Sequence, residues 1–173
     1  MDIQRITKIK FTAPEYREII DIYNNAFPKS ERIAPWMLRL LSHKKNFHWL
    51  AFYDDNRLCG FAYFTLNDTT IYLLYFAVNS RIRSKGYGSR ILSWIKENYP
   101  GREMLLDVEK LDENAQNYKQ RLKRIDFYRN NGIYQTGCFI EDRQVTYEIL
   151  STNKTFDKKR FNANMRSLFQ IFG

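Results

Sequence analysis

The stretch that decides the fold is Ile71-Tyr-Leu-Leu-Tyr-Phe-Ala-Val-Asn-Ser-Arg-Ile-Arg-Ser-Lys-Gly-Tyr-Gly-Ser-Arg-Ile-Leu92. Its first eight residues, 71–78, are all apolar or aromatic and predict a buried strand. Ile91, Leu92 and Ile95 follow the two glycines at helical spacing and predict an amphipathic helix. A strand that leads through a basic, glycine-containing loop into a helix indicates a socket for a phosphorylated cofactor.

The loop explains why phosphate would bind there. The first turn of a helix carries backbone N–H groups without intrahelical partners and a partial positive charge. Gly86 and Gly88 place no Cβ atom in the way of a pyrophosphate, and Arg81, Arg83 and Lys85 add positive charge.

Two common phosphate motifs do not match. A P-loop ends in Gly-Lys-Ser/Thr, but Gly88 is followed by serine and arginine. A dinucleotide fingerprint needs a third small residue where this chain has Ile91. Asp107 and Glu109 do lie near the distance expected for its acidic residue, so the rejection rests mainly on Ile91.

A family resemblance rests on two motifs. They are Arg83-x-x-Gly86-x-Gly88 after the apolar strand and Phe127-Tyr128-Arg-Asn-Asn-Gly132-Ile133. Together they resemble the GNAT N-acetyltransferase superfamily, from the first strand to about Leu150. The resemblance implies an α/β (α+β) fold with a mixed central sheet flanked by helices. It also implies transfer of the acetyl group of acetyl-CoA to a primary amine, by direct attack in a ternary complex.

The order of predicted elements agrees with that fold. A capping-box spacing with a proline, Thr12-Ala-Pro14-Glu15, starts the first helix, and Pro100-Gly101 and Asn131-Gly132 end two later ones. Three successive strands in the middle of the chain are expected to be antiparallel. The predicted strands are 3–11, 47–53, 58–66, 71–78, 104–109, 133–139 and 144–150, and the other helices are 35–41, 86–98 and 115–129.

The resemblance also assigns the cofactor site. In the family, backbone groups at the end of the strand pair with the pantetheine arm and help to polarise the thioester carbonyl. These positions correspond to Phe76, Ala77 and Val78, which also suit simple core packing. The pyrophosphate loop corresponds to Arg83, Ser84, Lys85, Gly86, Tyr87, Gly88 and Ser89.

The catalytic assignments are less direct. Tyr128 matches the family tyrosine that donates a proton or hydrogen bond to the departing thiolate, although a core role beside Phe127 is the alternative. Glu109 shares a strand face with Asp107, and Glu31 lies between the first two helices. We predict Glu109 and Glu31 as candidates for binding or deprotonating the amine. A surface salt bridge or helix cap is the alternative for each.

Other polar residues carry less weight. Arg121 and Arg124 occupy positions where many relatives of the family have Asn and Ala. An arginine contact is therefore expected to replace the polar contact that those relatives make to the cofactor arm. His43 and His48 are weaker candidates for the base, and no His, Cys and carboxylate cluster suggests a metal. Cys59 and Cys138 are expected to be reduced, buried thiols.

Length and composition set the broad class. A chain of 173 residues with 44% hydrophobic residues fits one folded domain. No apolar run is long enough to span a bilayer and no signal-peptide core opens the chain, so we expect a cytoplasmic protein. The net charge of +9 is spread along the chain and no nucleic-acid reader motif occurs, so specific nucleic-acid binding is not expected.

The tail lies beyond the resemblance. We predict an acetyltransferase domain over residues 1–150 and an amphipathic helical extension over 151–173, which packs on the domain or on a partner in a homodimer. A basic helix on a membrane surface is the alternative. The predicted apolar stripe consists of Phe161, Met165, Leu168, Phe169 and Phe172.

No motif in the sequence identifies the amine acceptor. A small molecule or a peptide could supply the amine. A noncatalytic acetyl-CoA-binding module on the same fold remains the alternative function.

Overall fold

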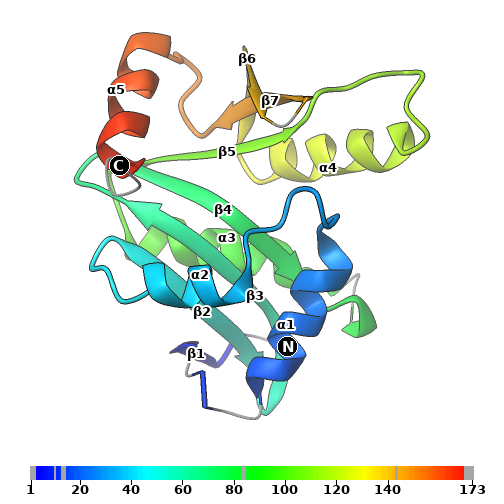
Figure 1. Cartoon of the computed structure of the whole chain (residues 1–173), viewed down its shortest axis with the longest axis vertical. Helices are drawn as coiled ribbons and strands as arrows, with labels where there is room; N and C mark the ends of the chain where they lie inside the picture. Colours follow the sequence, from blue (N-terminus) through cyan, green and yellow to red (C-terminus); the bar gives the residue numbers. More distant parts are fainter. Residues whose placement is uncertain (1–2, 10, 13–14, 83–84, 143, 170–173) are drawn as a thin grey trace. The chain divides into compact units, whose positions relative to one another are not determined.

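A computed structural model of the chain describes residues 3–9, 11–12, 15–82, 85–142 and 144–169. Within these residues the elements follow the expected order, with a helix in the tail last, and a short 3-10 helix at Ser80–Ile82 is the addition (Figure 1). The strands are β1 (Arg5–Lys8), β2 (Phe47–Asp54), β3 (Arg57–Leu66), β4 (Thr70–Val78), β5 (Glu103–Glu109), β6 (Tyr134–Asp142) and β7 (Val145–Ser151). The helices are α1 (Glu15–Ala26), α2 (Pro35–Leu41), the 3-10 helix η1 (Ser80–Ile82), α3 (Tyr87–Asn98), α4 (Tyr118–Asn130) and α5 (Lys158–Phe169).

Some boundaries differ from those predicted. The first strand is shorter than residues 3–11, and Pro14 of the predicted capping box lies outside the described residues. The helix predicted from residue 115 begins at Tyr118, because the preceding residues form turns. In these turns the Ala115 N–H donates to the carbonyl of Asp112 at 3.0 Å, and the Tyr118 N–H donates to the carbonyl of Ala115 at 3.0 Å.

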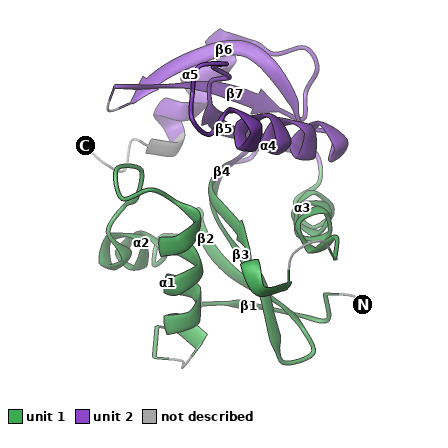
Figure 2. Cartoon of the chain, turned by 90° about the vertical axis from the view of Figure 1, so that its right-hand side faces the viewer, with its two compact units in different colours: residues 1–65, 73–100 green, residues 66–72, 101–173 purple. Residues whose placement is uncertain are grey.

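The strands form a seven-stranded mixed sheet in the order β1-β2-β3-β4-β5-β7-β6. The chain divides into two compact units (Figure 2). Unit 1 contains residues 1–65 and 73–100, and unit 2 contains residues 66–72 and 101–173. Strand β4 therefore begins in unit 2 with Thr70–Tyr72 and continues in unit 1.

Unit 1 is built on β1, β2, β3 and most of β4. Helices α1 and α2 lie on one side of these strands and α3 lies on the other (Figure 2). The Tyr23 ring of α1 packs 4.9 Å from that of Tyr75, and the hydroxyl of Tyr63 donates to a carbonyl of α2 at 3.2 Å. On the opposite side, the Trp94 ring of α3 lies 5.5 Å from that of Phe52. Because both faces are covered, β2 and β3 are apolar almost throughout.

Unit 2 is built on the start of β4 with β5, β6 and β7. Thr70–Tyr72 pair in parallel with β5, while β5–β7 and β6–β7 are antiparallel. The register between β6 and β7 shifts between Gln135 and Phe139, where Gly137 has a φ of 70°. Helix α4 contributes the buried side chains of Ile125 and Tyr128.

The described side chains of α5 contact other parts of unit 2. Phe161 is buried, with its ring 5.6 Å from that of Phe156. Nη2 of Arg160 lies 2.7 Å from Oε2 of Glu103, and Nδ2 of Asn164 donates to Oγ1 of Thr70 at 2.7 Å. Of the predicted stripe, Leu168, Phe169 and Phe172 lie outside the described side chains. No helix in the described part of the chain is both long and apolar enough to cross a membrane.

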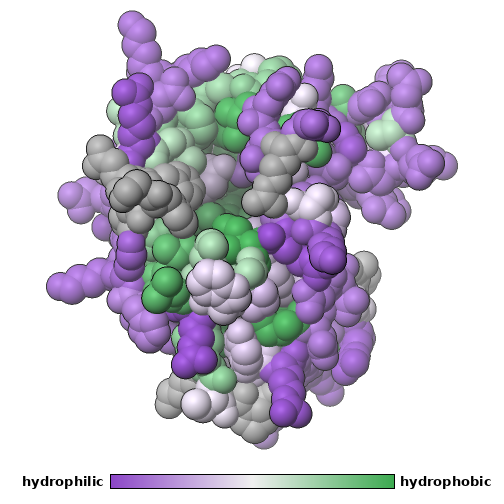
Figure 3. Space-filling view, viewed as in Figure 1, coloured by the Kyte–Doolittle hydropathy of each residue, from purple (hydrophilic) through white to green (hydrophobic). Residues whose placement is uncertain are grey.

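One helix of unit 1 exposes large apolar side chains. Hydrophobic and weakly polar residues gather over α2 on the face shown in Figure 3. On this helix Trp36 is 65% exposed and Leu40 is 60% exposed, one turn apart. The covered face of α2, in contrast, buries Leu38 and Leu41.

Candidate active site

The end of β4 is held closely against β3. A Cβ atom at Gly60 would lie 2.4 Å from the carbonyl oxygen of Ala77 and 3.1 Å from Cα of Val78, so only glycine fits without a backbone shift. Ala77 is buried, whereas Phe76 and Val78 are partly exposed. These three residues are the predicted partners of the pantetheine arm.

Asn79 fixes the chain as it leaves β4. Its N–H donates to the carbonyl of Cys59 at 2.8 Å, and its side-chain amide donates to the carbonyl of Leu58 at 3.0 Å. Its side-chain oxygen accepts the N–H of Arg81 at 3.1 Å. Asn79 is not among the predicted site residues, although an asparagine directly after an apolar strand is a known turn signal.

A pocket of about 330 Å³ opens beside this strand end, within unit 1. Val78, Asn79 and Arg81 line one side of it. The α1 side presents charged groups of both signs, including the carboxylates of Glu18 and Asp21.

Helix α3 starts at the predicted loop. Its N-cap is Gly86, which adopts the left-handed conformation with a φ of 74°, and no side chain of a described residue caps the helix. A Cβ at Gly86 would meet nothing within 4 Å, so the glycine is required for its backbone conformation and not for lack of space. Lys85 is exposed beside it. Arg83 and Ser84 lie outside the described residues.

The side chain of Tyr87, the first residue of α3, points into unit 1. Its buried hydroxyl donates a hydrogen bond to the carboxylate of Asp54, at the end of β2. This hydrogen bond, with burial, raises the pKa of Tyr87 to about 12. The phenol is therefore engaged within the protein, and the atoms that Tyr87 could offer to a phosphate are those of its backbone.

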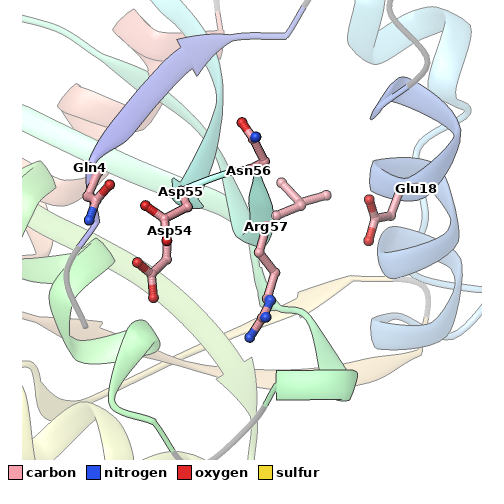
Figure 4. Close-up of a pocket in the computed structure, with 7 residues that line it drawn as sticks. Gln4, Glu18, Asp54, Asp55, Asn56 and Arg57 are labelled. Carbon is pink, nitrogen blue, oxygen red and sulfur yellow. The ribbon is translucent and has the colours of Figure 1, made fainter.

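Asp54 also lines a larger open pocket of about 780 Å³ (Figure 4). The turn between β2 and β3 forms one wall of this pocket, and Glu18 of α1 faces that turn. The pocket lies beside the hydrogen bond that joins the turn to the start of α3. Its lining consists of Gln4, Glu18, Asp54, Asp55, Asn56, Arg57 and Leu58.

Tyr128 lies on α4 in unit 2 and is 8% exposed. The pKa of its phenol is raised to about 12, and burial is the main cause. The charge of Arg124 opposes this shift, and the charge of Asp107 adds to it. The phenol is therefore protonated at neutral pH and can act as a proton donor.

Asp107 belongs to β5, lies near Tyr128 and is partly exposed. The phenol of Tyr72 donates a hydrogen bond to its Oδ1. Burial raises the pKa of the Asp107 carboxyl above its usual value, the Tyr72 hydrogen bond lowers it, and the charge of Asp142 raises it. A carboxylate whose pKa is raised above its usual value is a stronger base, which is a property expected of a general base.

Glu109, two residues further along β5, is held by α4. Nη2 of Arg121 lies 2.8 Å from Oε1, and Nη1 of Arg124 lies 3.7 Å from Oε2. Asn117 donates to Oε2 at 3.2 Å. Both carboxylate oxygens are thus used to attach α4 to β5, which leaves Glu109 less suited than Asp107 to accept a proton. Arg121 also donates to the carbonyl of Lys110 at 2.6 Å.

Glu31 belongs to unit 1 and is partly exposed between α1 and α2. Its backbone carbonyl accepts the hydroxyl of Tyr75 at 2.8 Å, and the same hydroxyl accepts the N–H of Ile33 at 3.0 Å. Tyr23 donates to the carbonyl of Ile33 at 2.9 Å. This loop is therefore anchored to α1 and β4.

The predicted residues thus fall into two groups. Asp107, Glu109 and Tyr128 all lie in unit 2, whereas Glu31 and the described residues of the predicted cofactor site belong to unit 1. His48 stacks on Phe64 with ring centres 5.1 Å apart, and burial lowers its pKa. Among the described residues, no group of three or more His, Cys, Asp or Glu side chains could hold a metal ion.

Comparisons with known proteins agree with this architecture. A model of the acetyltransferase (GNAT) family matches residues 15–132. No curated protein matches the chain. A Bacteroides thetaiotaomicron structure described as a GNAT-family acetyltransferase is 23% identical, with a TM-score of 0.75, and the match covers 95% of this chain and 94% of that one.

Two further structures share the fold at lower identity. An aminoglycoside 6′-N-acetyltransferase in complex with coenzyme A is 14% identical, with a TM-score of 0.64 and coverage of 89% of this chain and 100% of that chain. The ribosomal-protein-S18-alanine N-acetyltransferase of Escherichia coli is 14% identical, with a TM-score of 0.62 and coverage of 88% and 98%. The match of the family model to residues 15–132 covers more than half of the chain and confirms the resemblance seen in the two motifs. The chain therefore belongs to the acetyltransferase (GNAT) family.

Proposed function

We propose that this protein transfers the acetyl group of acetyl-CoA to a primary amine by direct attack in a ternary complex. The observation that carries the proposal is the start of α3, where left-handed Gly86 follows β4 and begins a helix that no side chain of the described residues caps. Such a helix end binds phosphate through its backbone amides. Its position within the part of the chain matched by the family model supports a CoA pyrophosphate as the ligand.

Structural neighbours support the same cosubstrate. One has been crystallised with coenzyme A and another, from Elizabethkingia anophelis, with acetyl-CoA bound. In our proposal, backbone groups of Phe76, Ala77 and Val78 bind the pantetheine arm and the thioester. The tight packing of this strand end against Gly60 would keep those groups in place.

We assign the proton transfers to unit 2. Asp107 takes a proton from the amine, directly or through a water molecule, and the free amine attacks the thioester carbonyl. The C–N bond forms, the C–S bond breaks, and the phenol of Tyr128 gives its proton to the departing sulfur. The nitrogen, which is positively charged after the attack, loses its second proton to the Tyr128 phenolate, and Asp107 releases the first proton to solvent. The raised pKa of Asp107 makes its carboxylate a stronger base than usual, and the pKa of about 12 keeps the Tyr128 phenol protonated at neutral pH.

The two predicted glutamates receive different roles. We propose that Glu109 holds α4, and with it Tyr128, through its bonds to Arg121, Arg124 and Asn117. Glu31 remains a proposed contact for the positive charge of the amine, because its partly exposed side chain lies in an anchored loop.

Two measurements test this function. Titration calorimetry with acetyl-CoA tests cosubstrate binding, and a thiol-release assay with polyamines, aminoglycosides, amino-acid derivatives and peptides tests transfer. N-acetylated forms of the same amines serve as matched controls, because they have no free amine to react. Absence of acetyl-CoA binding would refute the proposal. Tight binding without thiol release for any amine would instead indicate a noncatalytic acetyl-CoA-binding module.

A further inference from the structure

Tyr72 makes a contact that the motifs do not account for. It is the last residue of β4 that belongs to unit 2, and it pairs with Leu105 of the parallel strand β5. Asp107 lies two residues beyond Leu105, so its side chain points to the same face of the sheet. There the Tyr72 hydroxyl donates to Oδ1 of Asp107.

The two residues differ in exposure. Tyr72 is 5% exposed, whereas Asp107 is partly exposed. Burial and the charge of Asp107 raise the pKa of Tyr72 well above its usual value, so the phenol stays protonated and can only donate to the carboxylate. A buried ring has few alternative rotamers, and the donor is therefore fixed in direction.

A fixed donor on one oxygen has two consequences for a carboxylate. It prevents the group from rotating, so the second oxygen, Oδ2, keeps one direction. It also stabilises the ionised form, which is the only form able to accept a proton. Burial and the charge of Asp142 favour the neutral acid, and the Tyr72 hydrogen bond opposes them together with a weaker one from the backbone of Asp107 itself.

We propose that Tyr72 is a positioning residue that orients the Asp107 carboxylate and keeps it ionised, so that Oδ2 can take the proton of the amine. This inference rests on the proposed function, in which Asp107 is the general base. Tyr72 itself exchanges no proton in the reaction. Its contribution is to hold the Asp107 carboxylate, which does exchange a proton, in position and in its ionised form.

Charged and titratable groups from several elements lie around Asp107. Tyr72 comes from β4, Asp142 from β6, and Tyr128 from α4, which also carries Arg124. On β5 itself, Glu109 is neutralised by its two arginines. On β7, Glu148 lies opposite Val108 and therefore projects to the other face of the sheet. Tyr72 is the neighbour whose side-chain hydrogen bond favours the ionised carboxylate.

The test compares Tyr72→Phe with Tyr63→Phe. Each variant removes one buried hydroxyl from a strand, but that of Tyr63 donates to the carbonyl of Leu38 and not to Asp107. For Tyr72→Phe we expect kcat/KM to fall by about tenfold at pH 6, and less at pH 9, because the acidic limb of the pH profile moves to higher pH. For Tyr63→Phe that limb should not move.

A second readout does not depend on activity. The ¹³Cγ resonance of Asp107, assigned by its loss in Asp107→Asn, should titrate at higher pH in Tyr72→Phe than in the wild type. An unchanged titration, or an equal loss of kcat/KM at all pH values, would overturn the inference. Failure of the proposed function looks different, because the wild type itself would then release no thiol while the resonance still responded to Tyr72→Phe.

Discussion

Gly60 and Ala77 are in such close contact that a side chain on the first would strike the backbone of the second: a Cβ atom would lie 2.4 Å from the Ala77 carbonyl oxygen. A glycine on β3 therefore sets the position of the residues at the end of β4. These are the residues proposed to bind the pantetheine arm. The absence of a side chain at Gly60 is therefore expected to be needed for cofactor binding as well as for packing.

We predict that Gly60→Ala weakens acetyl-CoA binding by at least tenfold and destabilises the fold by about 1–3 kcal/mol, because the obstructing atom is backbone and cannot rotate away. Calorimetry and thermal unfolding measure the two effects. Ala62→Gly is the control, since Ala62 is also fully buried on β3. It should lose stability through backbone entropy but keep its affinity. Equal affinity of Gly60→Ala and the wild type would contradict the proposed role of this strand end.

The start of α3 gives a second prediction. Gly86 and Gly101 have φ values of 74° and 77°, and at both a Cβ would meet nothing within 4 Å. Alanine at either position should therefore cost about 1 kcal/mol of backbone strain. Only Gly86→Ala should also weaken acetyl-CoA binding, because it alters the helix end proposed to hold the pyrophosphate. If both variants bound equally well, the cofactor would not depend on this turn.

Tyr128 gives a test of acid catalysis. Tyr128→Phe should lower kcat by about 10²-fold or more while acetyl-CoA affinity stays unchanged, because it removes the proton donor and keeps the ring. Tyr118→Phe, on the first turn of the same helix, is the matched control and should leave kcat unchanged. Since the pKa of Tyr128 is raised to about 12, this group should cause no loss of activity up to about pH 10. A normal kcat in Tyr128→Phe would show that this tyrosine only packs in the core and is not the acid.

Glu109 and Asp107 can be separated by mutation. The side chains of Glu109 and Arg121 are 14% and 17% exposed, and removing one partner of such a pair leaves a poorly solvated charge. Glu109→Gln should therefore lower the free energy of unfolding by about 2–4 kcal/mol. Its kcat should fall less than that of Asp107→Asn. The opposite ranking in the thiol-release assay would make Glu109 the base, as the sequence alone allows.

The sequence predicts local features better than contacts across the fold. The apolar run at 71–78 and the glycines after it are enough to predict a strand, a loop and a helix, because each signal lies within one element. The partners of Tyr87 and Tyr72, in contrast, lie 33 and 35 residues away in sequence, and no spacing rule connects them. Glu109 illustrates the same limit. Its position on a strand is predictable, but its attachment to Arg121 follows only from the packing of α4 against β5.

The last prediction concerns stability and pH. The pKa of Asp107 is raised in the folded state above the usual value of an aspartic acid, so protonation of this carboxyl favours folding. That contribution is complete below the unfolded-state pKa and is lost as the pH rises through the folded-state pKa. At pH 8 the wild type therefore bears the cost of a partly buried negative charge. Asp107→Asn removes this charge and retains an oxygen that can accept the hydrogen bond of Tyr72.

Asp107→Asn should accordingly be inactive but more stable than the wild type at pH 8, with a midpoint of thermal unfolding higher by about 2–4 °C for each kcal/mol gained. The two midpoints should converge as the pH falls through the folded-state pKa, because the wild-type carboxyl then becomes protonated. Asp126→Asn, on the exposed face of α4 where Asp126 pairs with Arg129, is the control and should show no gain at pH 8. A stability gain for Asp107→Asn that was larger at pH 4 than at pH 8 would show that the folded protein favours the ionised carboxylate. Asp107 would then be held as a structural ion and would be a poor base for the amine.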